Sequence, residues 1–455
     1  MSGVEAHPTQ LGGFTARSRP AFGLRPTLRF TLAVSLTIAY LVFAVWVSQP
    51  WRSDLEAEIG PVMAWAIPVL LAYIPCLLIG FLCFTLLLTR YHPPPLDGEW
   101  PAITVVVAAY NEERGIERTI ERIAASTYEG PIEVVLADNN STDRTAELGE
   151  AAARRYELDY RRSFEPVAGK HNALNTALTG VTTPVVVTLD ADTLLNREAL
   201  SYLVGRLMSR PQDQHVCACA GALIAENAQH NFLTRMQGWD YRLGINGVKR
   251  TQASYNSALV AQGAFSAYWT DDIRAVGGWP DAIGEDIVLT WTLMGSRGLV
   301  QYEPVALAET IVPERLRHFM RQRSRWARGM FEGIQINPPF RQPRVLAKVV
   351  AGIDYLVPLL DVGYIFFWVP GVILFFFGHP LLFSWWSMLV IPLTLGIFGL
   401  LRRWQDRNVF GRLDMILEHD RRGFFGYLFA YQVVTSSASL RGYAQHIFGA
   451  ARRWK

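Results

Sequence analysis

The chain has 455 residues, enough for one sizeable soluble domain together with several membrane spans. Hydrophobic residues make up 50% of it and charged residues only 18%, an apolar bias that points toward a membrane. The formal net charge of +3 is too small to indicate a nucleic acid as partner.

Two stretches near the N-terminus carry no charged residue and are long enough to cross a membrane. They run from Phe30 to Trp51 and from Gly60 to Thr89, and both exceed the roughly 20 residues needed to span a hydrocarbon core. Two further spans are expected after a charged middle region, followed by an apolar segment that either crosses or re-enters the membrane: 355–378, 381–401 and 423–440.

Arginine side chains indicate how the spans are oriented. Several precede the first span and several more follow the fourth, whereas the loop between the first two spans holds Arg52 beside three acids. Basic residues mark the cytosolic side of a membrane. We therefore expect the N-terminal arm, the middle region and residues 402–422 in the cytosol.

The middle region, from Tyr91 to about Pro338, alternates short apolar runs with helical stretches. Continuous β-branched runs are typical of strands that are buried on both faces of a parallel sheet. The alternation predicts an α/β fold with a mostly parallel, doubly wound sheet, whose ligands bind at the carboxyl ends of its strands. The three clearest strands are expected at Ile103–Ala109, Glu133–Ala137 and Pro184–Leu189.

Acidic residues directly follow two of these strands. Asp138 ends the second, and Asp190-Ala191-Asp192 follows the third, so these carboxylates are expected at the edge where ligands bind. Two carboxylates in one turn suit a hard divalent cation, because Mg²⁺ takes one or two of them and completes its shell with substrate phosphates. The alternative is a turn whose acids only cap the next helix.

A lysine and another pair of acids lie at the starts of later helices. Lys170 either meets phosphate beside the positive end of its helix or is a solvated surface lysine. In Gly284-Glu285-Asp286 the acids either cap the helix or provide Asp286 as a general base for an acceptor hydroxyl. The small-residue turn at 262–266 lets an acceptor chain approach the backbone.

The segment from Pro313 to Pro338 is strongly basic and also rich in aromatic and methionine side chains. It is typical of an amphipathic helix lying in the membrane surface. Gln322 and Trp326 are four residues apart and so share a helix face. We expect the indole of Trp326 to stack there on a sugar ring and Arg325 to meet phosphate, in addition to any contact with the membrane.

One acid lies inside an expected span. Asp361 follows Asp354 by two helical turns, roughly 10 Å along the helix axis. An ionisable group at such a depth predicts a functional site that faces a water-filled or sugar-filled cavity. The alternative is an acid that reaches back to the membrane surface.

Together these motifs resemble those of processive, membrane-bound family 2 glycosyltransferases, the polysaccharide synthase group. The resemblance covers roughly residues 100–335 and the flanking spans, and it is greatest toward poly-N-acetylglucosamine synthases, followed by hyaluronan, chitin and cellulose synthases. It rests on Asp138, Asp190-Ala191-Asp192, Gly284-Glu285-Asp286 and Gln322-Arg323-Ser324-Arg325-Trp326, in this order.

The resemblance implies a GT-A catalytic domain and inverting, processive transfer from a UDP-sugar, best matched by UDP-N-acetylglucosamine. The product would be a polysaccharide, exported through the protein's own helices across the inner (plasma) membrane. Mg²⁺ or Mn²⁺ is the implied cofactor, membrane lipid is a further implied partner, and a small accessory membrane subunit is compatible with it.

The resemblance also implies roles for particular residues. The group often has two successive acids where this chain has Asp138-Asn139, which puts tight contact with uridine in doubt. By this resemblance Asp138 would contact the nucleobase, Lys170 would contact the phosphates, and Asp190 and Asp192 would hold the sugar diphosphate and its metal. Asp286 would be the general base. Gln322, Arg325 and Trp326 would close over the donor and acceptor sugars.

Other functions stay open on these residues. A β-glucan (cellulose-like) or hyaluronan-type synthase is not distinguished by any residue, whereas Trp326 weighs against a non-processive transferase that uses a lipid carrier. The acids in catalytic order weigh against a transporter or a scaffold that only binds nucleotides. The expected organisation begins with a cytosolic arm (1–29), two transmembrane helices (30–90) and the GT-A domain (91–312). Interfacial helices with the Gln-x-x-Arg-Trp motif (313–353) and two more transmembrane helices (354–401) follow. A basic cytosolic loop and the crossing or re-entrant segment come last (402–455).

Overall fold

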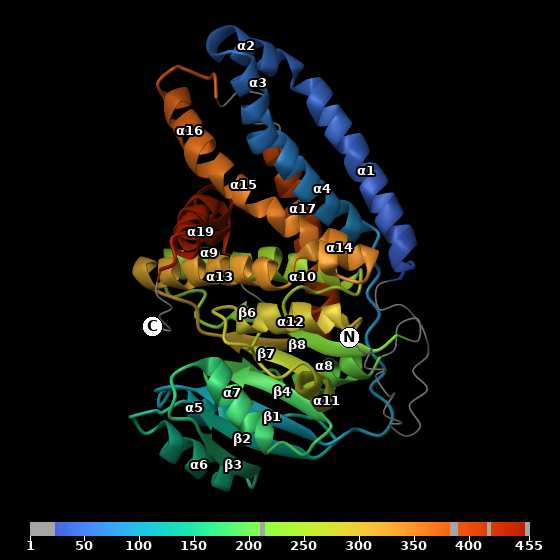
Figure 1. Cartoon of the computed structure of the whole chain (residues 1–455), viewed down its shortest axis with the longest axis vertical. Coiled ribbons are helices and arrows are strands. Elements are labelled where there is room, and N and C mark those ends of the chain that lie inside the picture. The colour runs from blue at the N-terminus through green and yellow to red at the C-terminus, as the bar shows by residue number, and fades with distance from the viewer. Residues whose placement is uncertain (1–22, 210–213, 383–389, 416–419, 451–455) are drawn as a thin grey trace.

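The computed structural model describes residues 23–209, 214–382, 390–415 and 420–450. An α/β body forms one end of the molecule, and long helices extend from it to the other end (Figure 1). Between them lies a layer of helices that includes α13 (Leu316–Ile336), α10 (Asn246–Ala253) and α14 (Val345–Gly352).

The sheet begins as the sequence predicts. Its parallel half has the order β3-β2-β1-β4, and the interiors of β1, β2 and β4 are buried, because their β-branched runs face helices on both sides. Helix α5 buries a stripe at Ile116, Thr119, Ile120 and Ile123, the spacing of one helix face. The bounds are β1 (Ile103–Ala109), α5 (Ile116–Ala124), β2 (Ile132–Asp138), α6 (Thr145–Arg155), β3 (Asp159–Phe164), α7 (Lys170–Thr179) and β4 (Val185–Asp190).

Beyond β4 the sheet continues with a change of direction. Strand β7 pairs antiparallel to β4 and to β6, whereas β6 and β8 pair parallel, so the sheet is mixed, with its parallel pairs in the majority. A strand that is buried on both faces consists of apolar residues whether its neighbours run parallel or antiparallel to it. The sequence pattern therefore did not reveal this change of direction. The bounds are β5 (Thr193–Leu195), α8 (Ala199–Met208), β6 (Val216–Ala225), β7 (Phe265–Trp269), α11 (Thr270–Ala275), α12 (Glu285–Gly295) and β8 (Leu299–Thr310).

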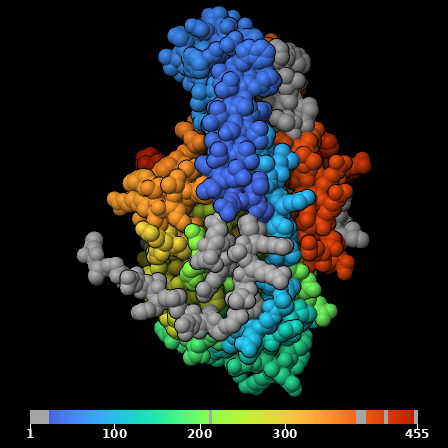
Figure 2. Space-filling model, turned by 90° about the vertical axis from the view of Figure 1, so that its right-hand side faces the viewer, coloured from blue at the N-terminus to red at the C-terminus, as the bar shows by residue number. Residues whose placement is uncertain are grey.

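Three helices among the described residues are long and apolar enough to cross a membrane: Pro26–Val47, Pro61–Leu87 and Val345–Phe376. The first, α1, lies on the outside of the helical end, where apolar side chains such as Trp46 and Val42 are exposed (Figure 2). The third begins earlier than the expected residue 355. The expected span at 381–401 lies partly outside the described residues, which resume at α17 (Val390–Asn408).

Two of these long helices widen to π-helical turns just before a proline. In the second, α3 (Pro61–Pro68) passes through η1 (Val69–Tyr73) into α4 (Ile74–Leu87), which holds Pro75. In the third, α15 (Val357–Gly363) passes through η6 (Tyr364–Trp368) into α16 (Val369–Phe376), which holds Pro370. Proline removes one helical hydrogen bond, and a π turn accommodates the resulting mismatch without breaking the helix.

The C-terminal apolar segment runs as consecutive helical pieces, α18 (Arg421–Gly426), η9 (Tyr427–Tyr431) and α19 (Gln432–Ile447). Helix α19 is seen end-on in Figure 1, across the direction of α1 and α4, and it packs on α13. It also decides the environment of Asp361, which is buried and accepts hydrogen bonds from Ser436 Oγ (2.6 Å) and Tyr443 Oη (2.7 Å). Both expectations for Asp361, that it faces a cavity and that it reaches back to the membrane surface, are therefore wrong. Its carboxylate is hydrogen-bonded by side chains of α19.

Candidate active site

Two of the predicted acids lie at the same edge of the sheet. Strand β1 lies between β2 and β4, and its register pairs Ala109 with Asp138 and Ala108 with Asp190. Because neighbouring strands lie about 4.8 Å apart, the two acidic residues are separated by roughly 10 Å along the same edge. This is the carboxyl edge at which the sequence predicts ligand binding.

The loops after β1 and β2 are bonded to each other. Asn111 N donates to Ser141 Oγ (3.0 Å), Thr142 N donates to Asn111 Oδ1 (2.8 Å), and Glu112 N donates to Thr145 Oγ1 (2.7 Å). Asn111 has a positive φ of 56°, a conformation that asparagine tolerates better than most residues. One side of the candidate site is therefore held in place by the protein's own contacts.

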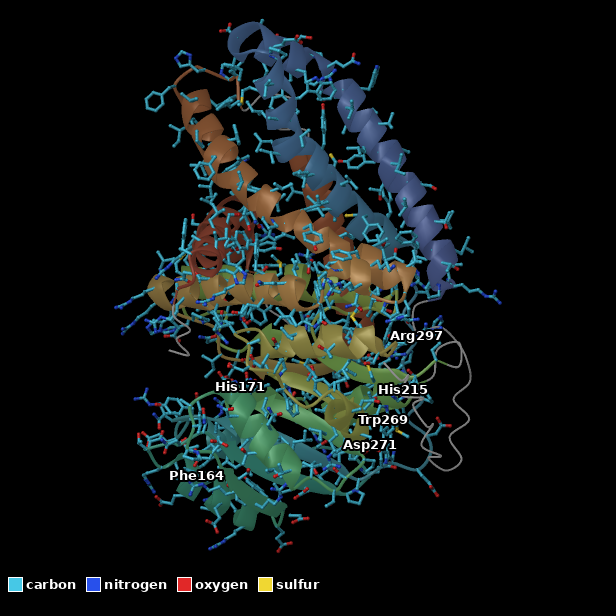
Figure 3. The ribbon with its side chains drawn as sticks, in the orientation of Figure 1. Phe164, His171, His215, Trp269, Asp271 and Arg297 are labelled. Carbon is cyan, nitrogen blue, oxygen red and sulfur yellow. The ribbon has the colours of Figure 1, made fainter. Side chains whose placement is uncertain are left out.

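Asp138 is fully buried and already partnered. Ser141 N donates to its Oδ1 (2.9 Å), and the Arg162 guanidinium donates to its Oδ2 (3.0 Å from Nε). Arg162 also lies over the ring of Phe164, the exposed last residue of β3 (5.1 Å from Cζ to the ring centroid; Figure 3). Contact of Asp138 with a nucleobase stays a prediction, because in this structure one carboxylate oxygen accepts from Ser141 in the loop and the other accepts from Arg162 in β3.

The residue that departs from the family's pair of acids has a structural role. Asn139 Nδ2 donates to Val167 O (2.7 Å), and its Oδ1 accepts from Gly169 N (2.8 Å). These bonds fix the segment that leads directly into Lys170 at the start of α7. An aspartate at 139 would lack the amide donor, so the asparagine suits this position.

The Asp190-Ala191-Asp192 turn is packed against the first turn of α5. Thr119 Oγ1 donates to Ala191 O (2.7 Å), and a Cβ at Gly115 would lie only 3.0 Å from the same oxygen. Burial, together with the charges of Asp190 and Glu112, raises the pKa of Asp192 to about 7. The turn thus gathers acidic side chains whose negative charges repel one another.

That charge fits a divalent cation. The described residues contain no cluster of three or more His, Cys, Asp or Glu side chains suited to a metal. A cation at this turn would therefore take Asp190 and Asp192 and complete its shell with diphosphate oxygens, as Mg²⁺ does in many nucleotide sites.

Lys170 joins this turn to the start of α12. Its ammonium contacts Asp190 Oδ1, and a Cβ at Gly263 would lie 3.0 Å from Lys170 Nζ. Burial lowers the pKa of Lys170, but the carboxylates of Asp190, Glu285 and Asp286 outweigh it and raise the pKa above its ordinary value. The structure thus places the lysine among acids, and contact with phosphate stays a prediction for the donor-bound state.

Asp286 lies in the first turn of α12 and faces the small-residue turn. Its Oδ2 accepts from Gly263 N (3.4 Å) and its Oδ1 from Ile287 N (2.8 Å), and the side chain is half-buried. The neighbouring Glu285 is buried, and burial together with Asp286 raises its pKa to about 7. Sequence reasoning missed Glu285, since adjacent acids at a helix start usually only cap it.

Helix α13 is held directly against this helix start. A Cβ at Gly329 would lie 2.9 Å from Gly284 Cα, so the two backbones touch where both residues lack a side chain. Glu332 Oε2 also accepts from Ile283 N (2.7 Å). Asp286 and the Gln-x-x-Arg-Trp motif therefore lie on two helices that are locked together at a glycine pair.

The three motif side chains on α13 differ in exposure. Arg325 is exposed, whereas Gln322 and Trp326 are half-buried. The charge of Arg325 opposes the rise in the pKa of Glu285, so the guanidinium lies near α12. Sequence reasoning also missed Tyr241. This tyrosine lies close enough to Asp192 and Arg325 for their charges to affect its pKa, but burial is the largest cause and raises that pKa to about 12.

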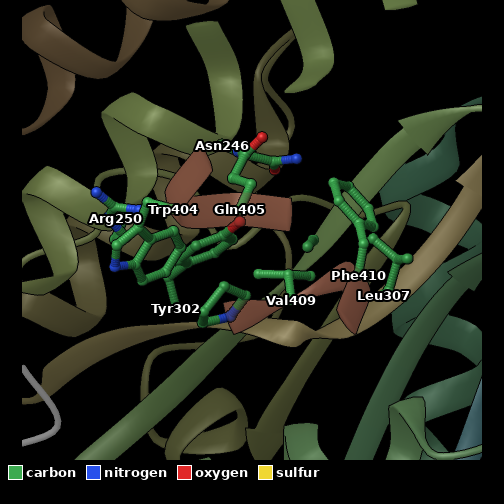
Figure 4. A pocket seen from close by; sticks show the side chains of 10 residues that line it. Asn246, Arg250, Tyr302, Leu307, Trp404, Gln405, Val409 and Phe410 are labelled. Carbon is green, nitrogen blue, oxygen red and sulfur yellow. The ribbon is translucent and has the colours of Figure 1, made fainter. Parts of the chain in front are cut away.

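A small cavity elsewhere does not belong to this site. It lies where α17 meets β8, and its lining includes Asn246, Tyr302, Gln405 and Arg250, whose guanidinium lies 3.4 Å from the centroid of the Trp404 ring (Figure 4). None of the predicted site residues lines it. Its contacts join the C-terminal part of the chain to the sheet.

We expect Gly329→Ala to lower transfer by about 10²-fold while UDP still binds, because a shift of about 1 Å in a positioned group costs that much. The added methyl would meet the backbone of Gly284 and push α13 away from Asp286. Gly295→Ala is the matched control, since a Cβ at that glycine of α12 meets nothing within 4 Å. Equal activity of the two variants would show that the glycine contact does not set the site.

Asp192→Ala should weaken UDP binding only in the presence of metal, because its proposed task is to hold the cation on the diphosphate. Titration of UDP with and without Mg²⁺ or Mn²⁺ measures this directly. The same loss in both titrations would mean that Asp192 acts on the structure of the turn and not through a metal.

Residues 104–277 match the sequence family described as Glycosyl transferase family 2. The chain carries a family 2 glycosyltransferase domain. That region contains Asp138, Lys170, Asp190 and Asp192, whereas Asp286 and the α13 motif lie beyond it.

Curated relatives match about half of the chain. A Mesorhizobium japonicum protein named N-acetylglucosaminyltransferase is 30% identical over 251 residues, which are 52% of this chain and 58% of that protein. A Staphylococcus aureus protein named poly-beta-1,6-N-acetyl-D-glucosamine synthase is 31% identical over 240 residues, 51% of this chain and 56% of that protein. The chain thus spans somewhat more than half the length of the curated relatives it matches.

Among solved structures, the fold is similar to that of a mannosyltransferase from Pyrobaculum calidifontis in complex with GDP-Man and Mn²⁺. The TM-score is 0.52 at 18% identity, and the match covers 93% of this chain and 100% of that chain. The α/β body therefore has a GT-A glycosyltransferase fold, as predicted, and the likeness extends to the helices around it.

Proposed function

We propose that the protein is an inverting, processive hexosyltransferase that extends a polysaccharide from a UDP-sugar, with UDP-N-acetylglucosamine as the donor. Support for the donor comes from the two relatives, whose names refer to N-acetylglucosamine transfer and to a polymer of that sugar. The polymer leaves across the inner membrane through the protein's own helices, which include the three apolar ones, with the α/β body in the cytosol.

One observation carries this proposal: four motifs distant in the chain converge on one place. Lys170 links the Asp190 turn to the start of α12, and the Gly284–Gly329 contact joins that start to the motif helix α13. A domain that only bound nucleotides would need the first of these links but not the second. The second brings an acceptor-side helix to the candidate base.

The proposed chemistry follows from the positions of the side chains. Mg²⁺ or Mn²⁺, held by Asp190 and Asp192, would offset the charge of the departing diphosphate. Lys170 exchanges its contact with Asp190 for the phosphate oxygens when the donor binds. Asp286 takes the proton of the acceptor hydroxyl, which then attacks the anomeric carbon from the side opposite to the UDP and inverts its configuration.

The acceptor side is formed by α13. Trp326 offers an aromatic surface to the terminal sugar, and Arg325, exposed and close to α12, reaches toward the diphosphate. Retention of the chain between additions requires such a surface, because a sugar released after each step would not be extended again. This is the part of the proposal that distinguishes a polymerase from a transferase that acts once.

The deciding experiment uses purified full-length protein in detergent with Mn²⁺ or Mg²⁺. UDP release is measured with UDP-N-acetylglucosamine, UDP-glucose and UDP-glucuronic acid, alone and in pairs, and any polymer is digested with linkage-specific hydrolases. We expect release with UDP-N-acetylglucosamine alone and a product that a poly-N-acetylglucosamine hydrolase degrades. Release only with UDP-glucose, a single sugar on a lipid carrier, or no release at all would each overturn the proposal.

A further inference from the structure

Three helices from distant parts of the chain meet at one buried guanidinium next to Trp326. Arg323 lies on α13, Asp240 opens the π-helical turn η3 (Asp240–Ile245), and Tyr431 ends η9. Arg323 Nη2 donates to Asp240 Oδ2 (2.9 Å) and to Tyr431 Oη (2.8 Å), and Tyr431 Oη donates to the same Asp240 oxygen (2.8 Å). The three groups form a closed triangle of hydrogen bonds.

This triangle is buried and packed against an aromatic ring. The side chains of Arg323 and Asp240 are 7% and 14% exposed, and the Tyr431 ring packs against Phe319 at 5.6 Å between centroids. Asp240 and Tyr431 each belong to a π-helical turn, a feature that is rare and frequent at functional sites. A charged group is stable at such depth only when its partners are fixed, which restricts where the guanidinium can lie.

The guanidinium so fixed covers one face of the Trp326 ring, with 4.2 Å between Arg323 Cζ and the ring centroid. A planar cation on an aromatic face holds the ring in one orientation. The indole is half-buried and also packs against the main core. Its orientation thus depends on η3 and on the C-terminal helix as well as on α13.

We propose that Arg323, locked by Asp240 and Tyr431, is a positioning residue that holds the Trp326 ring for the acceptor sugar. The inference rests on the proposed function, since it gives Trp326 the acceptor role. It makes the C-terminal segment, α18 to α19, part of the acceptor side of the site. Tyr431 would act there without touching the donor.

The test removes one hydroxyl group at a time from the contact between α13 and the C-terminal helices. Tyr431→Phe keeps the ring on Phe319 and loses only the bonds to Arg323 and Asp240. Ser324→Ala is the matched control, because it loses a buried hydrogen bond to Ala438 O (2.8 Å) in the same helix contact but away from Trp326. The measurements are polymer yield and length, UDP affinity with Mn²⁺, and transfer of the donor sugar to water.

We expect Tyr431→Phe to lower polymer synthesis roughly tenfold, less than the about 10²-fold that a misplacement of 1 Å causes. UDP affinity and transfer to water should change less than twofold, since the donor side is not touched. Ser324→Ala should stay within twofold of the wild type in every measurement. Equal losses in the two variants, or a normal polymer from Tyr431→Phe, would overturn the proposal.

A second comparison asks whether Tyr431 acts through Trp326. On a Trp326→Phe background, Tyr431→Phe should cost less than threefold, because groups that act as one unit are not additive. A full tenfold loss there would mean that the triangle only supports folding. If the wild type moves a single sugar to a lipid carrier, the proposed function fails, while both comparisons, measured on that product, still decide the role of Arg323.

Discussion

Asp286→Asn is expected to lower transfer by about 10²–10⁴-fold, the usual contribution of a general base. Asparagine keeps the shape of the side chain and its place in the first turn of α12, but it cannot take the proton of an acceptor hydroxyl. The affinity for UDP with Mn²⁺ should change little, because Asp286 is bonded to Gly263 N and Ile287 N and not to the Asp190 turn.

The control for this substitution is an acid in the same kind of position. Asp271 lies in the first turn of α11, is exposed, and is labelled in Figure 3. Asp271→Asn removes one negative charge from a helix start, as Asp286→Asn does, and it should leave transfer within about twofold, because exposed helix-start charges contribute little. Polymer synthesis by Asp286→Asn at close to the normal rate would exclude Asp286 as the base.

Trp326→Ala should abolish polymer synthesis while the protein stays folded and binds UDP. Alanine leaves no aromatic surface for the sugar, whereas phenylalanine at 326 should keep part of the activity. If Trp326 only anchored α13 to the membrane surface, the loss would instead appear as poorer membrane stability with normal specific activity in the surviving protein. The half-buried position of Trp326 under Arg323 favours the first outcome.

An exposed aromatic residue next to α13 provides the comparison. Phe340 lies in η4 (Pro339–Arg341) and is 65% exposed, so it is better placed than Trp326 to touch lipid. Phe340→Ala should affect membrane stability but not the length of the polymer. A folded Trp326→Ala protein that makes polymer of normal yield and length would contradict the processive-synthase proposal as a whole.

Local chemistry was readable from the sequence. The β-branched runs at Ile103–Ala109 and Val185–Asp190 became central strands, because such runs are stable only when they are covered on both faces. Asp138 and Asp190, which end β2 and β4, fell at the carboxyl edge, since parallel strands end on the same side of a sheet. The long uncharged stretches became α1 and the α3–α4 helix, because length and lack of charge suffice for a helix that can cross a membrane.

Contacts between distant segments were decided only in the tertiary structure. No local pattern shows that Asp138 is held by Arg162, that Lys170 contacts Asp190, or that Asp361 is bonded by α19, because each partner lies on another element. Gly284 and Gly329 are ordinary small residues in the sequence and become the joint between α12 and α13 only when two backbones meet. The sequence by itself determined which chemical groups the site holds, and packing decided which of them touch, since hydrogen bonds and close contacts depend on positions in space that residue order does not encode locally.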